Sequence, residues 1–297
     1  MKRDPDAGRA LAVALPKGSL QEATFALFKK AGYTVLLDSR SYFPFINDPE
    51  IKGRMLRAQE IARYVESGDL DCGITGLDWT LENNASVKEV ADLEYAKSSF
   101  RKVRWVLAVP ENSPVKKIEH LEGKRVCTEL VNYTKRYFKK HGVTAAVEYS
   151  WGATEAKVPD LADAIVELTE TGSSLRANKL RIVDTVLESS TRFIANREAW
   201  KDPWKRKKME DIALMLRGAL AAEGQVGLKM NLPRAALETV SAVLPAMKNP
   251  TVSPLSDASW VAIEVILSEK AARDIIPDLK RAGACDIIEY KLSKIIE

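Results

Sequence analysis

The stretch with the clearest chemical potential is DAIVELTETGSSL, residues 163–175. An apolar run resembling a buried strand ends at Glu167, and a loop rich in hydroxyls precedes the next apolar anchor. Such a loop, entering a helix at residues 172–174, presents backbone N–H groups and hydroxyls that suit a dianionic phosphate. The Glu167 carboxylate would accept hydrogen bonds from a sugar. By itself, the stretch is equally consistent with a strand-end turn followed by a capped helix.

Composition excludes several classes of protein. The 297 residues carry 45 Lys and Arg against 41 Asp and Glu, so a net charge of +4 gives no footprint for nucleic acid or a membrane surface. No apolar run approaches the roughly 18–20 residues of a membrane span. The N-terminus lacks the apolar core of a secretory signal. We expect a cytosolic enzyme or sensor without nucleic-acid or membrane partners.

No side-chain pattern predicts a metal cage or a histidine-centred site. The cysteines (72, 127 and 285) and the histidines (120 and 141) lack metal-ligand spacing. Neither GxxxxGK[ST] nor GxGxxG occurs, which argues against P-loop and Rossmann nucleotide sites. Any chemistry must therefore rest on carboxylates, cations and hydroxyls.

Strand-like runs alternate with amphipathic helices up to about residue 222, which predicts layered α/β structure. We expect two lobes with a cleft between them, the second inserted into the first. Lobe 1 would comprise residues 1–100 with a return segment of about 184–222, and lobe 2 residues 101–183. Ser19 and Glu22 have capping-box spacing. Asp202 and Pro203 predict the start of a long helix, on which KRKK (205–208) would form a solvated face.

Residues 224–297 have a different pattern. Their runs spell βαββαβ, the ferredoxin-like order of small ligand-sensing modules of the ACT or PII kind. This predicts an appended regulatory domain. Pro277 should kink or split its second helix.

Four segments together resemble the long form of ATP phosphoribosyltransferase, the first enzyme of histidine biosynthesis. They are LPKGSL (15–20), RAQEIARYVESGDLDCGITGLD (57–78), EAKVPDLADAIVELTETGSSL (155–175) and NPTVSPLSDASWVAIEVIL (249–267). The resemblance runs from about Leu11 to the C-terminus. It implies a two-lobed core like that of periplasmic binding proteins and a C-terminal domain that binds histidine as a feedback inhibitor. It also implies Mg²⁺ held mainly by substrate phosphates, and a cytoplasmic homo-oligomer, a hexamer in the family.

The resemblance also assigns site residues. Catalytic roles fall to Glu167, Asp163 and Lys17. Phosphoribosyl pyrophosphate would be bound by Glu167, Thr169, Thr171, Gly172, Ser173, Ser174 and Leu175. ATP would be bound by Lys17, Gly18, Arg57, Asp71, Gly76 and Glu155, and histidine by Thr251, Ser253 and Leu255.

Two positions depart from the family pattern, since many relatives have Asp at the Glu167 position and Thr at Ser174; both substitutions keep the chemical role. For Arg57, a surface ion pair with Glu60 or Glu66 is the alternative. We expect Glu170 to face water.

The resemblance implies transfer of the 5-phosphoribosyl group to N1 of ATP, with release of pyrophosphate. The rival hypothesis is a non-catalytic small-solute sensor with a binding-protein-like core. A sensor would explain two lobes and a cleft, but it would have no use for the phosphate loop.

Overall fold

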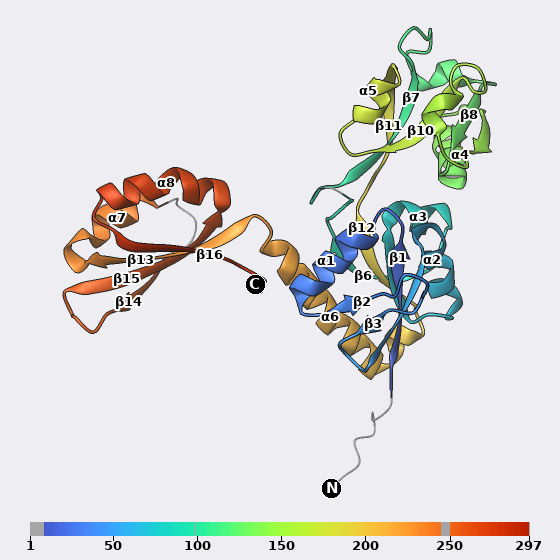
Figure 1. Cartoon of the computed structure of the whole chain (residues 1–297). Helices are drawn as coiled ribbons and strands as arrows, with labels where there is room; N and C mark the ends of the chain where they lie inside the picture. The colour runs from blue at the N-terminus through green and yellow to red at the C-terminus, as the bar shows by residue number, and fades with distance from the viewer. Residues whose placement is uncertain (1–8, 98, 245–249, 297) are drawn as a thin grey trace. The chain divides into compact units, whose positions relative to one another are not determined.

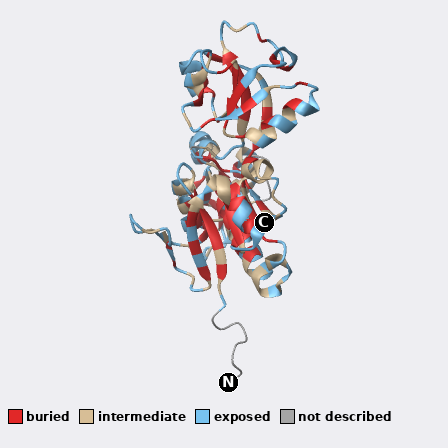
Figure 2. Ribbon diagram, turned by 90° about the vertical axis from the view of Figure 1, so that its right-hand side faces the viewer, coloured by how far each residue is buried: buried red, intermediate tan, exposed pale blue. Residues whose placement is uncertain are grey.

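Two chain segments, Met1–Leu216 and Arg217–Glu297, form separate compact units. The computed structural model describes residues 9–97, 99–244 and 250–296. The first unit contains two five-stranded sheets, one in each lobe, and the second contains a four-stranded sheet (Figure 1). Buried residues concentrate in the strands of the two lobes (Figure 2).

The lobe 1 sheet has the order β4-β1-β5-β12-β6. β1 is parallel to β4 and β5, whereas β12 is antiparallel to β5 and β6. The strands are β1 (Leu11–Lys17), β4 (Ile51–Arg57), β5 (Cys72–Gly76), β6 (Lys88–Leu93) and β12 (Thr191–Ala195). The connections hold α1 (Gln21–Ala31), the short pair β2 (Val35–Leu36) and β3 (Phe45–Ile46), α2 (Ala58–Ser67) and α3 (Leu77–Glu82). The predicted alternation of strand and helix is confirmed.

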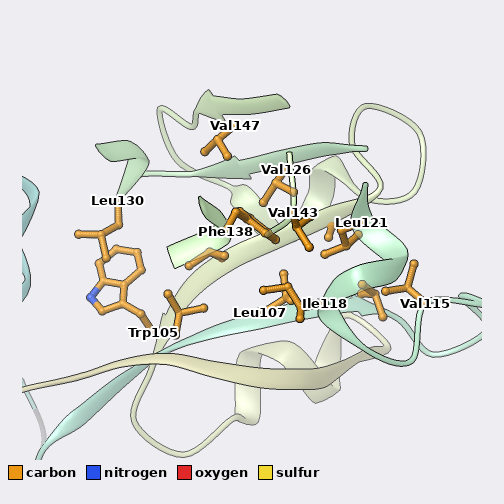
Figure 3. Packing of buried hydrophobic residues seen from close by; sticks show 14 residues of the cluster. Trp105, Leu107, Val115, Ile118, Leu121, Val126, Leu130, Phe138, Val143 and Val147 are labelled. Carbon is orange, nitrogen blue, oxygen red and sulfur yellow. The ribbon is translucent and has the colours of Figure 1, made fainter. Parts of the chain in front are cut away.

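The lobe 2 sheet has the order β11-β7-β10-β8-β9. Its strands are β7 (Val103–Pro110), β8 (Arg125–Thr128), β9 (Ala146–Tyr149), β10 (Ala164–Thr169) and β11 (Leu180–Ser189). The helical segments are η1 (Ile118–Leu121), α4 (Val131–Lys140), η2 (Thr154–Lys157) and α5 (Ser173–Ala177). Phe138 of α4 packs on the sheet with Leu107 and Val126, and Trp105 lies against Leu130 at the end of this core (Figure 3).

The chain passes between the lobes twice, between β6 and β7 and between β11 and β12. Lobe 2 is thus an insertion into lobe 1. Residues 184–189, expected in the return segment, belong to lobe 2 because β11 pairs with β7 as far as Ser189. β12 then starts in the lobe 1 sheet at Thr191.

Helix α6 (Pro203–Ala221) follows η3 (Ala199–Lys201). The Asp202 carboxylate accepts hydrogen bonds from the N–H groups of Trp204 and Lys205 at 2.9 and 3.1 Å, as an N-cap residue does. The predicted capping box at Ser19 is wrong. Helix α1 begins after Leu20 with no side-chain cap.

The KRKK stretch lies on α6, and each of its cations has a carboxylate partner: Lys205 with Asp71, Arg206 with Glu210, Lys207 with Asp211, and Lys208 with Asp48 and Glu50. Arg206 and Lys207 are exposed, as predicted for a solvated face, whereas Lys208 keeps only 17% of its side chain exposed.

The C-terminal unit has the predicted βαββαβ order. Its elements are β13 (Gln225–Pro233), η4 (Arg234–Ala236), α7 (Leu237–Val243), β14 (Thr251–Pro254), β15 (Trp260–Ser268), α8 (Glu269–Arg281) and β16 (Cys285–Lys291). The antiparallel sheet order is β14-β15-β13-β16, and α7 and α8 cover one face (Figure 1).

The prediction that Pro277 could split the second helix is wrong, because α8 continues to Arg281. A proline removes one backbone hydrogen bond. The buried Leu279, two residues further on, belongs to the core of the C-terminal unit and keeps the end of the helix packed. In the part of the chain that the structure describes, no helix is both long and apolar enough to cross a membrane.

Candidate functional site

The carboxyl end of the lobe 1 sheet brings two predicted cations together. Lys17 ends β1 and Arg57 ends β4, and the two residues are register partners in this parallel pair. Gly18 follows with a φ of 102°, a conformation that favours glycine. Lys17 and Arg57 therefore leave the same edge of the sheet.

A cavity of about 230 Å³, called the central cavity below, joins residues of both lobes. Lobe 1 supplies Lys17, Gly18 and Arg57, and lobe 2 supplies Glu129 and Glu167. The structure thus places the predicted ribose acid and three of the predicted ATP residues on one cavity. Glu129 escaped the sequence reasoning, although its position directly after a strand was the available signal.

Glu167 lies in β10, where its surroundings disfavour the ionised carboxylate. Burial raises the pKa of its carboxyl to about 7, and the negative charges of Glu155 and Glu129 act in the same direction. Hydrogen bonds from Thr154 and from the N–H of Leu168 oppose this shift. A ligand that brings hydrogen-bond donors or positive charge would therefore favour the ionised carboxylate.

Residues of the hydroxyl-rich loop after β10 themselves fix its conformation. The Thr169 hydroxyl accepts a hydrogen bond from the N–H of Gly172 at 2.7 Å, and Gly172 has a φ of 73°. The Leu175 side chain is 2% exposed and belongs to the lobe 2 core. Thr169 and Leu175 therefore hold the loop rather than offer side chains to a ligand.

The groups left exposed are those of Thr171, Ser173 and Ser174. Thr171 donates to the Ser173 hydroxyl at 3.0 Å, and Ser174 donates to the carboxylate of Glu155. Arg176, which the sequence reasoning missed, donates to the Thr171 carbonyl at 3.0 Å. The loop thus combines hydroxyls and one cation, and Glu155 ties it to η2.

Two predicted acids lie away from this site, at the amino ends of strands. The carboxylate of Asp163 accepts from the Arg125 N–H at 2.9 Å. That of Asp71 accepts from the Ala12 N–H at 2.9 Å and pairs with Lys205 at 2.6 Å. A strand rises about 3.3 Å per residue, so the four residues from Asp163 to Glu167 span about 13 Å. Both acids hold strand ends together, so neither is part of the candidate site.

Gly76 has a conformational role. A Cβ there would lie 1.9 Å from Oδ1 of Asp78. Asp78 is 4% exposed and accepts a hydrogen bond from the indole N–H of Trp105 at 2.7 Å, which links α3 to lobe 2. Trp105 and Trp79 pack edge to face, 5.8 Å apart, and both line the central cavity. The GITGLD motif therefore builds a contact between the lobes.

The second acid of the loop, Glu170, was expected to face water, and this is wrong. Its carboxylate accepts from the Ser99 hydroxyl at 3.0 Å. It lines a small cavity of about 110 Å³ with Gly76 and Asp78.

The alternative for Arg57 finds no support. Its guanidinium forms no ion pair with another residue that the structure describes. Glu60 accepts from the Arg57 backbone N–H at 3.3 Å, and Glu66 accepts from the Ser86 N–H at 2.7 Å. Arg57 is free to serve a ligand.

The three residues predicted to bind histidine lie together at the edge of the C-terminal sheet. Thr251 and Ser253 are exposed on β14, which pairs only with β15 among the strands of the described ranges. The Leu255 N–H donates to the Trp260 carbonyl at 3.3 Å. Across the described ranges no three Asp, Glu, His or Cys side chains are grouped to hold a metal ion.

Known proteins match almost the whole chain. The family model for ATP phosphoribosyltransferase matches residues 57–218, and that for the HisG C-terminal domain matches residues 222–294. The ATP phosphoribosyltransferase of Chlorobium phaeovibrioides is 59% identical over 292 residues, 98% of this chain and 99% of that protein. That of Thermodesulfovibrio yellowstonii is 59% identical over 288 residues, 97% of this chain and 99% of that protein.

Among solved structures, the ATP phosphoribosyl transferase (HisG:HisZ) complex from Thermotoga maritima matches with a TM-score of 0.59 and 26% identity. The match covers 70% of this chain and 98% of that chain. Family models and relatives thus agree over the catalytic core and the C-terminal domain. The chain belongs to the ATP phosphoribosyltransferase family and carries that family's C-terminal domain.

Proposed function

We propose that this chain catalyses the reaction of its family at the central cavity. The 5-phosphoribosyl group of phosphoribosyl pyrophosphate passes to N1 of ATP, giving N1-(5-phosphoribosyl)-ATP and pyrophosphate, the first step of histidine biosynthesis. The observation that carries this proposal is the meeting of Glu167 with Lys17, Gly18 and Arg57 on one cavity. A solute sensor would need neither the acid nor the hydroxyl loop beside it.

The two lobes would hold the two substrates. In lobe 2, Glu167 would accept hydrogen bonds from the ribose hydroxyls, and Thr171, Ser173 and Ser174 would receive the 5′-phosphate. In lobe 1, Lys17, Gly18 and Arg57 would face ATP. Glu155 would act by orienting Ser174, to which it is hydrogen bonded.

The chemistry fits a site without a histidine base. The N1 lone pair forms a bond to the anomeric carbon while the bond from that carbon to pyrophosphate breaks, and the electron pair leaves with the pyrophosphate. Because N1 of neutral adenine carries no proton, no general base is needed to generate the nucleophile. Positive charge develops on the ribose, so the Glu167 carboxylate would stabilise the transition state electrostatically. The cations Lys17 and Arg57 would stabilise phosphate charge.

Mg²⁺ fits this site as an ion carried by the substrates. Carboxylate and phosphate oxygens are the ligands that it prefers, and it is usually bound through one or two carboxylates plus substrate phosphates. Glu129 and Glu167 supply carboxylates at the central cavity. Bound Mg²⁺ would neutralise charge on the pyrophosphate.

The C-terminal unit would provide feedback control. Histidine would bind beside Thr251, Ser253 and Leu255, at a contact between copies of the chain in a cytoplasmic homo-oligomer. Inhibition then requires that histidine bind two conformations or assemblies with different affinities. Light scattering with and without histidine would measure the assembly.

A pyrophosphate-release assay on the full chain tests the proposal. Release should require phosphoribosyl pyrophosphate, ATP and Mg²⁺ together, and adenine or orotate should not replace ATP. Millimolar histidine should inhibit the reaction. Solute binding without ATP-dependent release would refute the catalytic proposal and favour a sensor. Release that is insensitive to histidine would refute only the regulatory part.

A further inference from the structure

A second and larger cavity of about 770 Å³ lies in lobe 1 and is called the arm cavity below. Its volume falls within the range of about 300–1,000 Å³ that is typical of small-molecule sites. It shares Lys17, Gly18 and Arg57 with the central cavity. The remaining lining residues are Gln21, Tyr42, Phe43, Arg54, Met55, Leu56 and Glu60.

The arm cavity is lined by more cations than acids. Lys17, Arg54 and Arg57 face it with a single carboxylate, that of Glu60. Within the described ranges of the chain, no ion pair involves any of these three cations. The four cations of residues 205–208, by contrast, all have carboxylate partners. Unpaired cations around a cavity create a local field that favours a polyanion.

Two exposed aromatic rings hold two of these cations. Nζ of Lys17 lies 4.0 Å from the ring centroid of Tyr42, and Cζ of Arg54 lies 5.4 Å from that of Phe43. Tyr42 is 53% exposed and Phe43 is 66% exposed, so neither ring is a core residue. Cation–π contacts of this kind restrict long basic side chains that would otherwise be mobile.

The backbone around these rings is fixed to β4. The carbonyl of Tyr42 accepts a hydrogen bond from the Met55 N–H at 2.8 Å. A Cβ on Gly53 would come within 2.8 Å of Pro44, so only glycine lets this segment lie so close to the strand. The sequence therefore places Tyr42 and Phe43 at the rim of the cavity.

We propose that the arm cavity binds the triphosphate of ATP, with Arg54 as a contact residue and with Phe43 and Tyr42 as positioning residues for Arg54 and Lys17. This inference rests on the proposed function. N1 of adenine must reach the anomeric carbon beside Glu167, so the base lies toward the central cavity. The triphosphate extends past Lys17 and Arg57, where the two cavities meet, toward Arg54. The pyrophosphate of the other substrate has the same chemistry, and the kinetic design separates the two.

The test uses Arg54→Met and Phe43→Ala in the full chain. KM for ATP is measured at saturating phosphoribosyl pyrophosphate, and KM for phosphoribosyl pyrophosphate at saturating ATP. We expect KM for ATP to rise about 10–100-fold in Arg54→Met, the effect of losing a charged hydrogen bond. In Phe43→Ala it should rise about 2–5-fold, the effect of losing an exposed cation–π contact. KM for phosphoribosyl pyrophosphate should not change, and Arg54→Lys should restore part of the loss.

Matched controls exist in the same lobe. Arg63 stacks on Tyr64 at 6.0 Å, and Phe45 is 63% exposed on the same segment, yet neither lines the arm cavity. Arg63→Met and Phe45→Ala should keep wild-type constants, and equal thermal midpoints would show that all five variants are folded.

Each outcome decides one point. Wild-type protein that fails to turn over would refute the proposed function. If the wild-type protein turns over but Arg54→Met and Phe43→Ala keep the same KM for ATP as the controls, this inference alone is refuted. A rise confined to KM for phosphoribosyl pyrophosphate would assign the cavity to pyrophosphate and also overturn it.

Discussion

Replacing Glu167 with glutamine should make the free protein more stable at alkaline pH. In the folded chain, burial raises the pKa of this carboxyl from about 4.5 to about 7. Between these values the folded state binds more protons than the unfolded state, so the stability contributed by Glu167 falls as pH rises and levels off above pH 7. Glutamine carries no proton that titrates in this range and keeps the shape of the side chain.

The size of the effect follows from the shift. At about 1.4 kcal/mol per pKa unit, and allowing for partial solvent screening, the carboxylate costs about 2–3 kcal/mol at pH 8. At pH 5 most of this cost is absent, because the folded state holds the proton, and the difference falls below about 1 kcal/mol. For a unit of this size, Glu167→Gln should melt roughly 4–10 °C above wild type at pH 8.

Thermal unfolding followed by circular dichroism at pH 5, 7 and 8, without substrates, measures this difference. Glu148→Gln is the matched control, since Glu148 is an exposed acid on β9 of the same sheet, separated from β10 by β8. It should show no gain that grows with pH. A Glu167→Gln variant no more stable than wild type at pH 8, or equally stabilised at every pH, would refute the reasoning.

Two further substitutions test contacts that stabilise the fold. Trp105→Phe removes the indole N–H that donates to the buried Asp78 carboxylate, and it should lower the free energy of unfolding by about 1–3 kcal/mol; an unchanged melting temperature would contradict this. Gly227→Ala would place a Cβ 2.2 Å from the Tyr290 ring and should destabilise the C-terminal unit by about 1–3 kcal/mol, as seen in its melting. Adding Tyr290→Ala should recover part of that loss, and a double variant that gains nothing would show that the contact is not its cause.

The sequence predicted those features that depend on local pattern. Alternating apolar runs predicted the strands and helices of both lobes, and the same reasoning predicted the βαββαβ order. It failed where side chains pair across the chain. Asp163 stands four residues before Glu167, yet an extended strand carries it to the other end of the sheet. Glu170 meets Ser99, 71 residues earlier, and no local pattern predicts that bond.

Exposed residues were also missed, for a different reason. Arg54 and Phe43 belong to no apolar stripe and match no motif, so only the cavity that they line reveals them. The return point of the chain was misplaced because β11 continues to Ser189, a length set by its pairing with β7.

The most direct test of the central claim is kcat/KM for phosphoribosyl pyrophosphate, measured as ATP-dependent pyrophosphate release at pH 8 with saturating Mg²⁺. The stabilised Glu167→Gln variant should lose about 30–1,000-fold, since one electrostatic contact to the transition state is worth roughly 2–4 kcal/mol. Glu148→Gln should stay within about two-fold of wild type, as expected for a surface change. A Glu167→Gln enzyme with wild-type kcat/KM would contradict the assignment of the active site to this carboxylate.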